Sequence, residues 1–316
     1  MQIASLDLNL LVALDALLSE ASVTRAAARL RLSQPALSAS LAKLRRHFGD
    51  ELLRRVGNSY ELTPLAVQLK HRTGFALDAV DRVFASQPAF DPAQGDREFR
   101  LLGSDYAMAV IGQAVSHLFA QRAPRLRLRI TPHSNAVVDN AAEMLRTVDG
   151  MLLPHGFLSG LPYTDLYEDS YVCLVATDNA EVGDRITMDD LARLPWVLTY
   201  HGPTAYTPAA RQLQLLGVEP QAQVVVESFL ALPYHLAGTN RVALAQARLV
   251  PRLVASGDVR ALPCPFDAVP LRQAMWWHPI NERDPAHVWL RELLMEACST
   301  LPVKPPSASL PAPNLR

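Results

Sequence analysis

The chain has 316 residues, more than a single hydrophobic core usually supports, so more than one packed unit is expected. Hydrophobic residues make up 49% of the sequence and aromatic residues 7%, a composition typical of a soluble, well-packed protein. The formal net charge is −1, but residues 1–72 carry ten Lys or Arg against six Asp or Glu, so the remainder is acidic. A basic N-terminal segment on an acidic body indicates that only one end meets nucleic acid.

The sequence excludes several classes of protein. No apolar run approaches the ~18 residues of a membrane-spanning helix, and no basic-then-apolar leader precedes Asp7. Cys173, Cys264 and Cys298 are odd in number, far apart in the sequence and match no metal motif, which fits a reducing compartment. We therefore expect a cytoplasmic protein without metal or cofactor, in which each cysteine is a small core residue. A thiol redox switch is the less favoured alternative.

The segment SVTRAAARLRLSQPALSASLAKLRRHF, at residues 22–48, predicts two short helices joined by a tight turn. The first helix is expected to run from Val23 to Arg31, with Ser22 as its N-cap. Ala27 lies in the middle of the apolar stripe of this helix. Because alanine is small, a second helix can approach closely there.

The second helix of the pair has two different faces. Ser33 is its expected N-cap, and Pro35 lies in the first turn, where a missing N–H does no harm. One face is apolar and consists of Leu37, Leu41, Leu44 and Phe48. The opposite face is small and basic, and consists of Pro35, Ala36, Ala39, Ala42, Lys43 and Arg46. Small side chains allow a helix to lie deep in a major groove.

Polar residues on this second helix suit contacts with DNA. Gln34 and Ser38 border the small face and can meet base edges, whereas Lys43, Arg45 and Arg46 can meet phosphates. The alternative is an ordinary helical pair with a solvated face. The pattern, the caps and the charge together favour DNA.

The flanking segments complete the module. Asp7 or Asn9 can cap a first helix that runs to about Glu20. After the helical pair, LLRR, a GNS turn and YEL predict a two-stranded wing, with Arg54 and Arg55 beside the DNA backbone or the minor groove. A solvated hairpin edge is the alternative for these two arginines.

A single long helix is predicted to follow. Thr63 and Pro64 supply an N-cap and a first-turn proline, and the apolar period continues until SQP at residues 86–88 stops it. A helix of roughly 23 residues spans about 35 Å. Because nothing local covers its apolar stripe, we expect it to pair with a second copy. Gly74 can mark a bend, and the alternative is a helix that packs within one chain.

Beyond a Pro-, Gly- and Asp-rich hinge at residues 88–96, strand and helix patterns alternate, which predicts an α/β fold. REFRLLG (97–103) leads into a helix at about Ser104, RLRLRIT (125–131) predicts a strand, and a further helix covers residues 136–145. Short apolar runs predict buried parallel strands at 151–153, 171–176, 196–198, 224–226 and 242–245.

These runs carry a clear family resemblance. Between Leu6 and Pro64, LDLNLLVALDALL, SVTRAAARL, SQPALSASLAKLR, FGDELLRR and YELTPLA resemble, without gaps, the winged helix-turn-helix of LysR-type transcriptional regulators. Later residues, including VVVESFLALPYHLAGTNRVALA, resemble the NodD-like branch, whose members sense aromatic compounds. One departure is Ala39, because many relatives carry arginine directly after the serine equivalent to Ser38. That base contact is absent here.

The resemblance implies an N-terminal winged helix-turn-helix (all-α with a β wing), a long linker helix and a C-terminal α/β effector domain. This effector domain would have two periplasmic-binding-protein-like subdomains. The implied limits are 1–63 for the DNA-binding domain, 64–87 for the linker and dimerisation helix, 88–96 for the hinge, 97–301 for the effector domain and 302–316 for a disordered tail. Subdomain I would comprise 97–167 and 271–301, and subdomain II would comprise 168–270.

Two sets of contact residues follow. Those expected at DNA are Arg25, Arg31, Ser33, Gln34, Pro35, Ala36, Ser38, Ala39, Lys43, Arg45, Arg46, Arg54 and Arg55. Ligands of such sheets bind beyond the carboxyl ends of strands, near helix N-termini. This rule selects Ser104, Asp105, Tyr106, His133, Ser134, Asn135, His155, Tyr200, His201, Thr204, Phe229 and Leu230, with Thr207 nearby. Taken singly, each of them is as readily a structural residue. As a group they suit a small aromatic acid or phenol.

We therefore expect a sequence-specific regulator whose partners are promoter DNA, a small effector, further copies of itself and, as a candidate, RNA polymerase. The family implies a dimer of dimers on an interrupted palindrome. An enzyme is not expected, because GxSxG, HExxH, a Walker-type phosphate loop and GxGxxG are all lacking. The alternatives are a non-specific architectural DNA-binding protein and, less favoured, a small-molecule-binding protein or enzyme on a periplasmic-binding-type fold.

Overall fold

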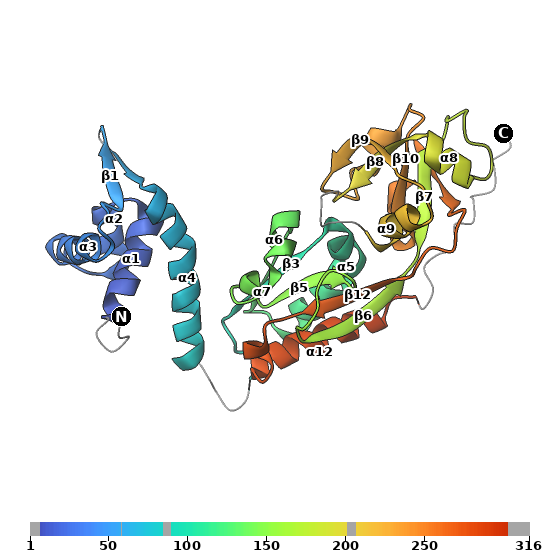
Figure 1. The fold of residues 1–316 in the computed structure, drawn as a ribbon. Coiled ribbons are helices and arrows are strands. Elements are labelled where there is room, and N and C mark those ends of the chain that lie inside the picture. Colours follow the sequence, from blue (N-terminus) through green and yellow to red (C-terminus); the bar gives the residue numbers. More distant parts are fainter. Residues whose placement is uncertain (1–6, 58, 85–89, 201–206, 303–316) are drawn as a thin grey trace. The chain divides into compact units, whose positions relative to one another are not determined.

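The computed structural model describes residues 7–57, 59–84, 90–200 and 207–302. The chain divides into two compact units, residues 1–88 and residues 89–316, whose helices and strands are labelled in Figure 1. Within the described ranges, no helix has the length and apolar character needed to cross a membrane. In the same ranges, no group of three or more His, Cys, Asp or Glu is placed to hold a metal ion.

The N-terminal unit begins with α1 (Leu8–Glu20), α2 (Val23–Leu30) and α3 (Gln34–Phe48). Their N-caps are the predicted Asp7, Ser22 and Ser33, and each side chain accepts a hydrogen bond from a first-turn N–H, at 3.0 to 3.4 Å. These bonds satisfy backbone donors that a helix start leaves free. Arg31, expected inside the first helix of the pair, instead caps its C-terminus with a φ of 56°, and its side chain is exposed.

The apolar faces of these helices meet in one core. Leu17, Leu18 and Leu37 are fully buried there, and so is Ala26 on α2. Ala27 is also buried, and its small side chain lets α2 pack closely against its neighbours. Because the leucines of α3 face this core, the opposite face of α3 is left to solvent.

A two-stranded wing and a long helix complete the unit. β1 (Leu53–Val56) and β2 (Ser59–Leu62) pair antiparallel, as predicted. α4 (Pro64–Phe84) follows at once. Its cap is Thr63, whose Oγ1 accepts a hydrogen bond from a first-turn N–H at 3.1 Å and donates one to Asp50 Oδ1 at 2.7 Å. Pairing of α4 with a second copy stays a prediction.

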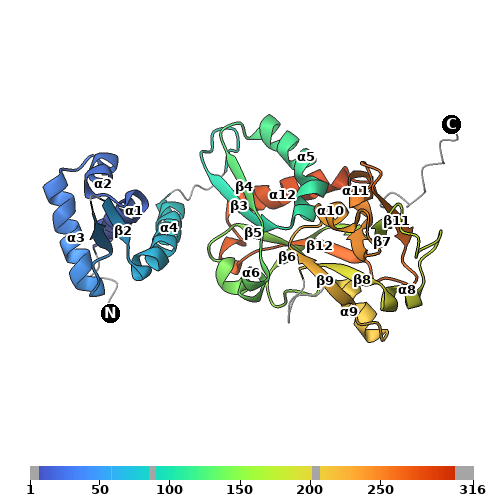
Figure 2. The same cartoon turned by 90° about the horizontal axis from the view of Figure 1, so that it is seen from above.

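The C-terminal unit is built on two five-stranded sheets (Figures 1 and 2). The first has the order β4-β3-β5-β12-β6, with bounds β3 (Glu98–Gly103), β4 (Arg127–Thr131), β5 (Gly150–Pro154), β6 (Tyr163–Asp169) and β12 (Leu271–Trp276). β3 runs parallel to β4 and β5, whereas β12 runs antiparallel to β5 and β6. The strand predicted from RLRLRIT is therefore β4, at one edge of this sheet.

The second sheet has the order β11-β7-β10-β8-β9, with bounds β7 (Tyr171–Ala176), β8 (Pro195–Thr199), β9 (Gln221–Val226), β10 (Val242–Gln246) and β11 (Val259–Pro263). β8 is parallel to β9 and β10, as expected. β7 is instead antiparallel to β10 and β11. It continues from β6 across Ser170, so its direction is set by the crossing from the first sheet and not by a returning helix. β9 is an edge strand and not a buried one, since Val225 is 50% exposed.

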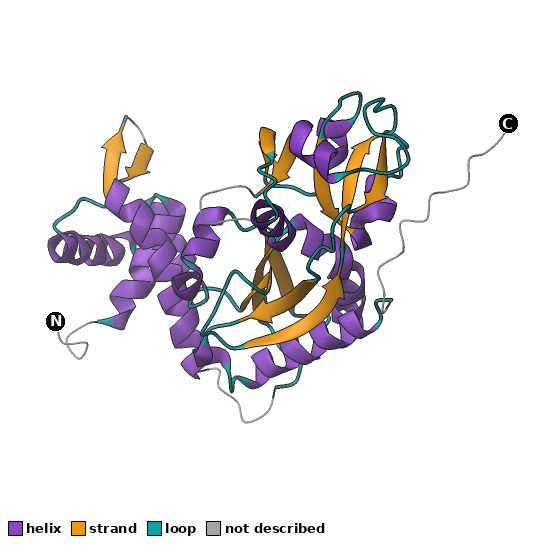
Figure 3. Cartoon of the chain, turned by 45° about the vertical axis from the view of Figure 1, so that its right-hand side comes forward, coloured by secondary structure: helices purple, strands orange, loops and turns teal. Residues whose placement is uncertain are grey.

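Helices lie against the strands of both sheets (Figure 3). The helices of this unit are α5 (Asp105–Arg122), α6 (Asn135–Asp139), α7 (Ala141–Met144), α8 (Met188–Arg193), α9 (Pro208–Leu215), α10 (Leu232–Leu236), α11 (Val250–Leu253) and α12 (Pro285–Ser299), with 3₁₀ turns at Ala247–Leu249 and Pro279–Asn281. The single helix predicted for residues 136–145 was wrong, because α6 and α7 are separate. Asn140 lies between them, and its Nδ2 donates to the Ala136 carbonyl at 3.0 Å, which competes with helix continuation.

Two of the cysteines come together in the fold. The Sγ atoms of Cys173 and Cys264 lie 4.0 Å apart, because β7 and β11 pair with Leu262 opposite Cys173. All three thiols are free. The neighbouring Cys264 and burial raise the pKa of Cys173, and burial raises the pKa of Cys298 to about 12. Cys173 and Cys298 are therefore protonated core residues rather than reactive thiolates.

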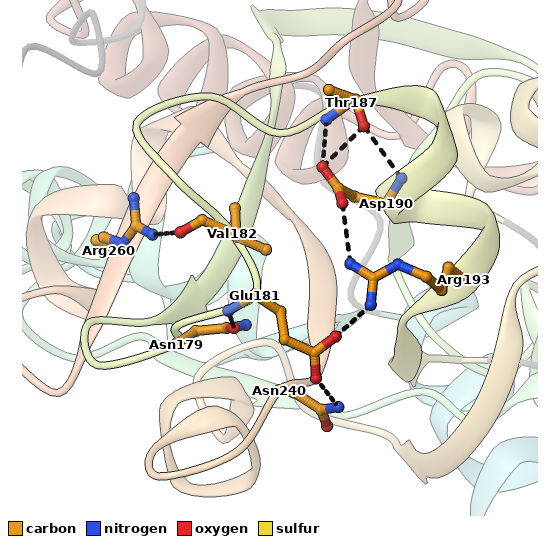
Figure 4. A network of polar contacts seen from close by, with 8 residues as sticks. All are labelled: Asn179, Glu181, Val182, Thr187, Asp190, Arg193, Asn240 and Arg260. Atoms are coloured by element: carbon orange, nitrogen blue, oxygen red, sulfur yellow. Dashed lines mark hydrogen bonds and ion pairs between the residues drawn. The ribbon is translucent and has the colours of Figure 1, made fainter.

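A polar network fastens the segment before α8 to the second sheet's loops (Figure 4). The Glu181 carboxylate accepts hydrogen bonds from Asn240 Nδ2, at 2.7 Å, and from the Arg193 guanidinium. Arg193 also donates to Asp190 at 3.1 Å, and Asp190 forms a capping box with Thr187 at the start of α8. Asn240 and Arg193 lower the pKa of Glu181, so the network is intact when this carboxylate is charged.

Candidate functional site

The predicted DNA-contacting face of α3 points to solvent. Its exposed residues are Ser33, Gln34, Pro35, Ala36, Ser38, Ala39, Lys43 and Arg46. Leu37, Leu41 and Leu44, on the other face, are buried. Within the described residues, Lys43 and Arg46 form no hydrogen bond or ion pair. Both cations are therefore available to an anionic surface.

Arg45 differs from its two basic neighbours. Its Nε donates to the Glu51 carbonyl at 2.8 Å, and its Nη2 donates to the Leu53 carbonyl at 2.9 Å. These carbonyls lie at the start of the wing, so Arg45 fastens the wing to α3. Sequence reasoning grouped it with the phosphate contacts, because a basic residue beside two others gives no sign of its backbone partners.

Three of the remaining predicted arginines have local partners. Arg25 donates to the Glu20 carbonyl and lies 3.5 Å from its carboxylate. Arg54 lies 3.7 Å from Glu61 across the wing, and Arg55 Nε donates to a turn carbonyl at 3.2 Å. All three are exposed, so these surface pairs are weak and leave the charges accessible to a partner. Contact with DNA stays a prediction for each of them.

A cleft of about 520 Å³, its opening to solvent included, lies between the two sheets of the C-terminal unit. Six predicted effector residues line it: Ser104, Tyr106, His133, Asn135, Tyr200 and Phe229. They come from the segments after β3, β4, β8 and β9, as the rule on carboxyl ends of strands implies. Thr207 also lines the cleft, while His201 and Thr204 lie outside the described residues.

Aromatic rings form a continuous wall of this cleft. The Tyr106 ring lies 6.1 Å from that of Phe229, measured between centroids, and Phe229 lies 5.5 Å from Tyr200. The His133 ring follows, 5.3 Å from Tyr200. Such a wall offers flat apolar surface to a planar ligand.

The polar members of the wall are uncharged. Burial lowers the pKa of His133 to about 4, so its imidazole is neutral at physiological pH. Burial likewise raises the pKa of Tyr200. Tyr200 also has a φ of 52°, a left-handed conformation unusual for a residue other than glycine. The strand end at Thr199 thus turns sharply and brings this ring to the cleft.

Sequence reasoning missed two glutamines of the cleft. Gln246 ends β10, Gln273 lies in β12, and each is only 1% exposed. The sequence contained a signal, because both are amides within otherwise apolar strands, VALAQ and LRQAMW. Polar side chains are rarely buried in such strands without a partner.

Four predicted residues do not line the cleft. Asp105 instead bonds to the loop after β9, where it accepts a hydrogen bond from the Leu230 N–H at 2.9 Å. Ser134 begins α6 without a side-chain cap bond. His155 Nε2 lies 2.6 Å from Asp165 Oδ1. These contacts give Asp105, His155 and the backbone of Leu230 structural partners, and a ligand role for them stays a prediction.

Tyr106 reaches beyond the cleft into a buried polar cluster. Its hydroxyl donates to Asp169 Oδ2 at 2.8 Å. Asp169 also accepts from the Ser170 N–H at 2.7 Å and from the Arg248 N–H at 3.3 Å. Burial raises the pKa of both Tyr106 and Asp169. The cluster lies where β6 passes into β7. It therefore links Tyr106, which lines the cleft, to the segment where the chain crosses between the two sheets.

Comparisons with known proteins agree with this arrangement. Residues 8–67 match the family model of the bacterial regulatory helix-turn-helix protein, lysR family, and residues 94–299 match the LysR substrate binding domain. Nodulation protein D 2 of Rhizobium tropici is 34% identical over 95% of this chain and 96% of its own length. Nodulation protein D 1 of Mesorhizobium japonicum is 33% identical over the same shares.

Solved structures show the same fold. The probable transcriptional regulator PA0477 from Pseudomonas aeruginosa superposes with a TM-score of 0.71, at 26% identity, over 93% of this chain and 98% of that one. Full-length CbnR in complex with its target DNA superposes with a TM-score of 0.63, over 93% of this chain and 99% of that one, and at 17% identity shows the fold alone. With both parts of the chain matched, the protein belongs to the LysR family of bacterial transcriptional regulators.

Proposed function

We propose that this LysR-type regulator binds an interrupted palindrome near a promoter, with the α3 helices of a dimer in successive major grooves. The observation that carries the proposal is the exposed face of α3, where small residues adjoin Lys43 and Arg46, two cations without a partner among the described residues. Small side chains allow close approach to base edges, and the cations can meet phosphates. α4 is the proposed dimer contact, and two dimers are the proposed tetramer.

The proposed signal is a small aromatic compound, an acid or a phenol, that enters the cleft in the cytoplasm. Support comes from the aromatic wall of Tyr106, Phe229 and Tyr200. A ligand that binds two arrangements of the sheets unequally shifts the balance between them. Such a shift would change the spacing of the DNA-binding pairs, and RNA polymerase at the promoter is the proposed recipient of that change.

A footprint of the purified full-length protein on the DNA upstream of its own gene tests this function. The experiment includes competitor DNA and moderate salt, because phosphate contacts alone give binding that falls steeply with salt. Protection of an interrupted palindrome over several helical turns is the expected result. Salt-sensitive binding to any duplex, without local protection, would instead indicate a non-specific architectural protein.

A further inference from the structure

Two thiols from distant parts of the sequence meet at the second sheet. Cys173 lies in β7 and Cys264 follows β11, 91 residues further along the chain, yet their Sγ atoms are 4.0 Å apart. Cys173 is fully buried, whereas Cys264 is partly exposed, so the pair can be reached from solvent through Cys264. Both thiols are free, and neither lines the cleft. The functions proposed so far therefore do not use them.

The strand register shows how the two sulfurs are related. In the antiparallel pair of β7 and β11, Leu262 is directly opposite Cys173, and Pro263 is opposite Val172. Cys264 is therefore a diagonal neighbour of Cys173. Diagonal neighbours lie about 7–8 Å apart in the backbone, which is more than a disulfide spans unless the strands move. The two sulfurs are placed to share a third atom rather than to bond to each other.

A soft metal ion fits this spacing. A metal–thiolate bond is about 2.3 Å long, and the two sulfurs are 4.0 Å apart. Both can therefore bind one ion that lies off the line between them. Zinc takes four ligands in structural sites, but among the described residues no third His, Cys, Asp or Glu joins the pair. Soft thiolate ligands alone favour Cu(I).

Binding of such an ion changes the charge at the site. Each thiol gives up its proton and no electron is transferred, so one monovalent ion between two thiolates leaves one negative charge. A buried charge requires a hydrogen-bond donor. Tyr171 lies two residues before Cys173, on the same face of β7. Its buried hydroxyl has no hydrogen-bond partner in the described part of the chain, so it is a donor available on this face.

The two thiols also lie at the connections between the sheets. β7 is the strand by which the chain enters the second sheet after Ser170. Cys264 begins the segment that leads from β11 back to β12 in the first sheet. An ion bound to both sulfurs would therefore cross-link the entry to the second sheet with the exit from it.

We propose that Cys173 and Cys264 form a binding site for one soft monovalent metal ion of the Cu(I) type, and that the bound ion fastens β7 to the segment after β11. This proposal is independent of the DNA target and of the effector, because neither of those proposals involves these thiols. Sequence spacing does not reveal the site, since the two cysteines come together only in the folded sheet.

Silver nitrate supplies the test ion, because Ag(I) has the charge of Cu(I), shares its preference for sulfur and is stable in air. The reduced full-length protein is mixed with one equivalent of Ag(I) and one of glutathione, which competes for ions held by a single thiolate. Native mass spectrometry should show one silver ion per chain and the loss of two protons. At a free ion concentration about a hundredfold above the dissociation constant, the melting temperature should rise by at least about 5 °C.

Three variants assign the bound ion to its ligands. Cys173→Ala and Cys264→Ala should each lose the silver adduct and the rise in melting temperature. Cys298→Ala removes another buried free thiol, in α12, and is the matched control that should keep both. Melting without silver shows whether each variant folds, and Cys264→Ala, at a partly exposed position, decides the outcome if Cys173→Ala does not.

A silver adduct that survives in Cys264→Ala, or that disappears in Cys298→Ala, would overturn the proposal. The same holds if air oxidation joins Cys173 to Cys264, seen as the loss of two hydrogen atoms, because the register argument excludes that bond. Cu(I), added in oxygen-free buffer, should compete with Ag(I) for the site, and failure to compete would also count against it. None of these outcomes affects the footprint, which needs no metal.

Discussion

Asp105 and Ser228 are 123 residues apart in the sequence, yet the Ser228 hydroxyl donates to the Asp105 carboxylate at 2.7 Å. The backbone N–H of Phe229 donates to the same carboxylate at 3.1 Å, and that of Leu230 does so at 2.9 Å. Asp105 begins α5 beside the first sheet, whereas Ser228 follows β9 of the second. One carboxylate therefore ties the two sheets together beside the cleft.

Replacing the Asp105 carboxylate should weaken the connection between the two sheets. In Asp105→Asn, one acceptor oxygen becomes an NH₂ group that faces N–H donors, so hydrogen bonds to a charged group are lost. We expect the free energy of unfolding to fall by about 1–3 kcal/mol, measured by urea denaturation. Asp184→Asn, at an exposed loop position without such contacts, is the control. Equal stability of the two variants would contradict a structural role for Asp105.

His133 should make stability depend on pH. Its pKa falls from an ordinary value of 6.5 to about 4 in the fold, so between these values the unfolded chain binds the extra proton. Stability is therefore full above pH ~6.5 and declines as pH falls toward ~4, by roughly 3 kcal/mol for this group.

The measurement for His133 compares melting temperatures over that pH range. His133→Gln should flatten the decline, because the group that takes up the proton is gone. His117→Gln, at an exposed position of α5, should leave the decline as it is in the wild type. If His133→Gln and the wild type lose stability in parallel on acidification, burial of this imidazole does not have the stated effect.

Features that depend on residues close together in the sequence could be predicted from it. Asp7, Ser22 and Ser33 cap helices through hydrogen bonds to N–H groups only two or three residues away. The direction of each strand within its sheet was harder to predict from the sequence. β7 is antiparallel because the chain crosses between sheets at Ser170, and no local pattern shows that crossing. The helix predicted over residues 136–145 is interrupted at Asn140, because the side chain of Asn140 forms a hydrogen bond to the backbone. Hydrophobic periodicity does not reveal such a bond.

The cleft could be predicted only in part. The rule on strand ends found Tyr106 and Tyr200, because it depends on the order of strands and helices. It also selected Asp105, which does not line the cleft and whose hydrogen-bond partners lie more than 120 residues further along the chain. It also missed Gln246 and Gln273, because they lie within strands rather than after them. Their place in the cleft is apparent only in the folded structure, where strands of both sheets line that cleft.

Arg45 and Arg46 are adjacent and should behave differently. Arg45 holds two wing carbonyls, so Arg45→Ala should lower the free energy of unfolding by about 1–3 kcal/mol. Arg46→Ala removes an exposed cation without partners in the described chain and should change stability by no more than about 0.5 kcal/mol. Urea denaturation of both variants checks this. A larger loss in Arg46→Ala than in Arg45→Ala would reverse the assignment of roles.

The exposed face of α3 gives the sharpest prediction on DNA. Arg46→Ala should weaken binding to operator and random duplex alike and reduce the salt slope by about one, since a phosphate contact carries no sequence information. Gln34→Ala should leave random binding unchanged and relax preference at one base pair by about 1–3 kcal/mol. Fluorescence anisotropy at several salt concentrations measures both. Arg283→Ala, which removes an exposed cation from the C-terminal unit, controls for net charge. If Arg46→Ala and Gln34→Ala weaken operator and random DNA by the same factor, α3 does not read sequence through Gln34.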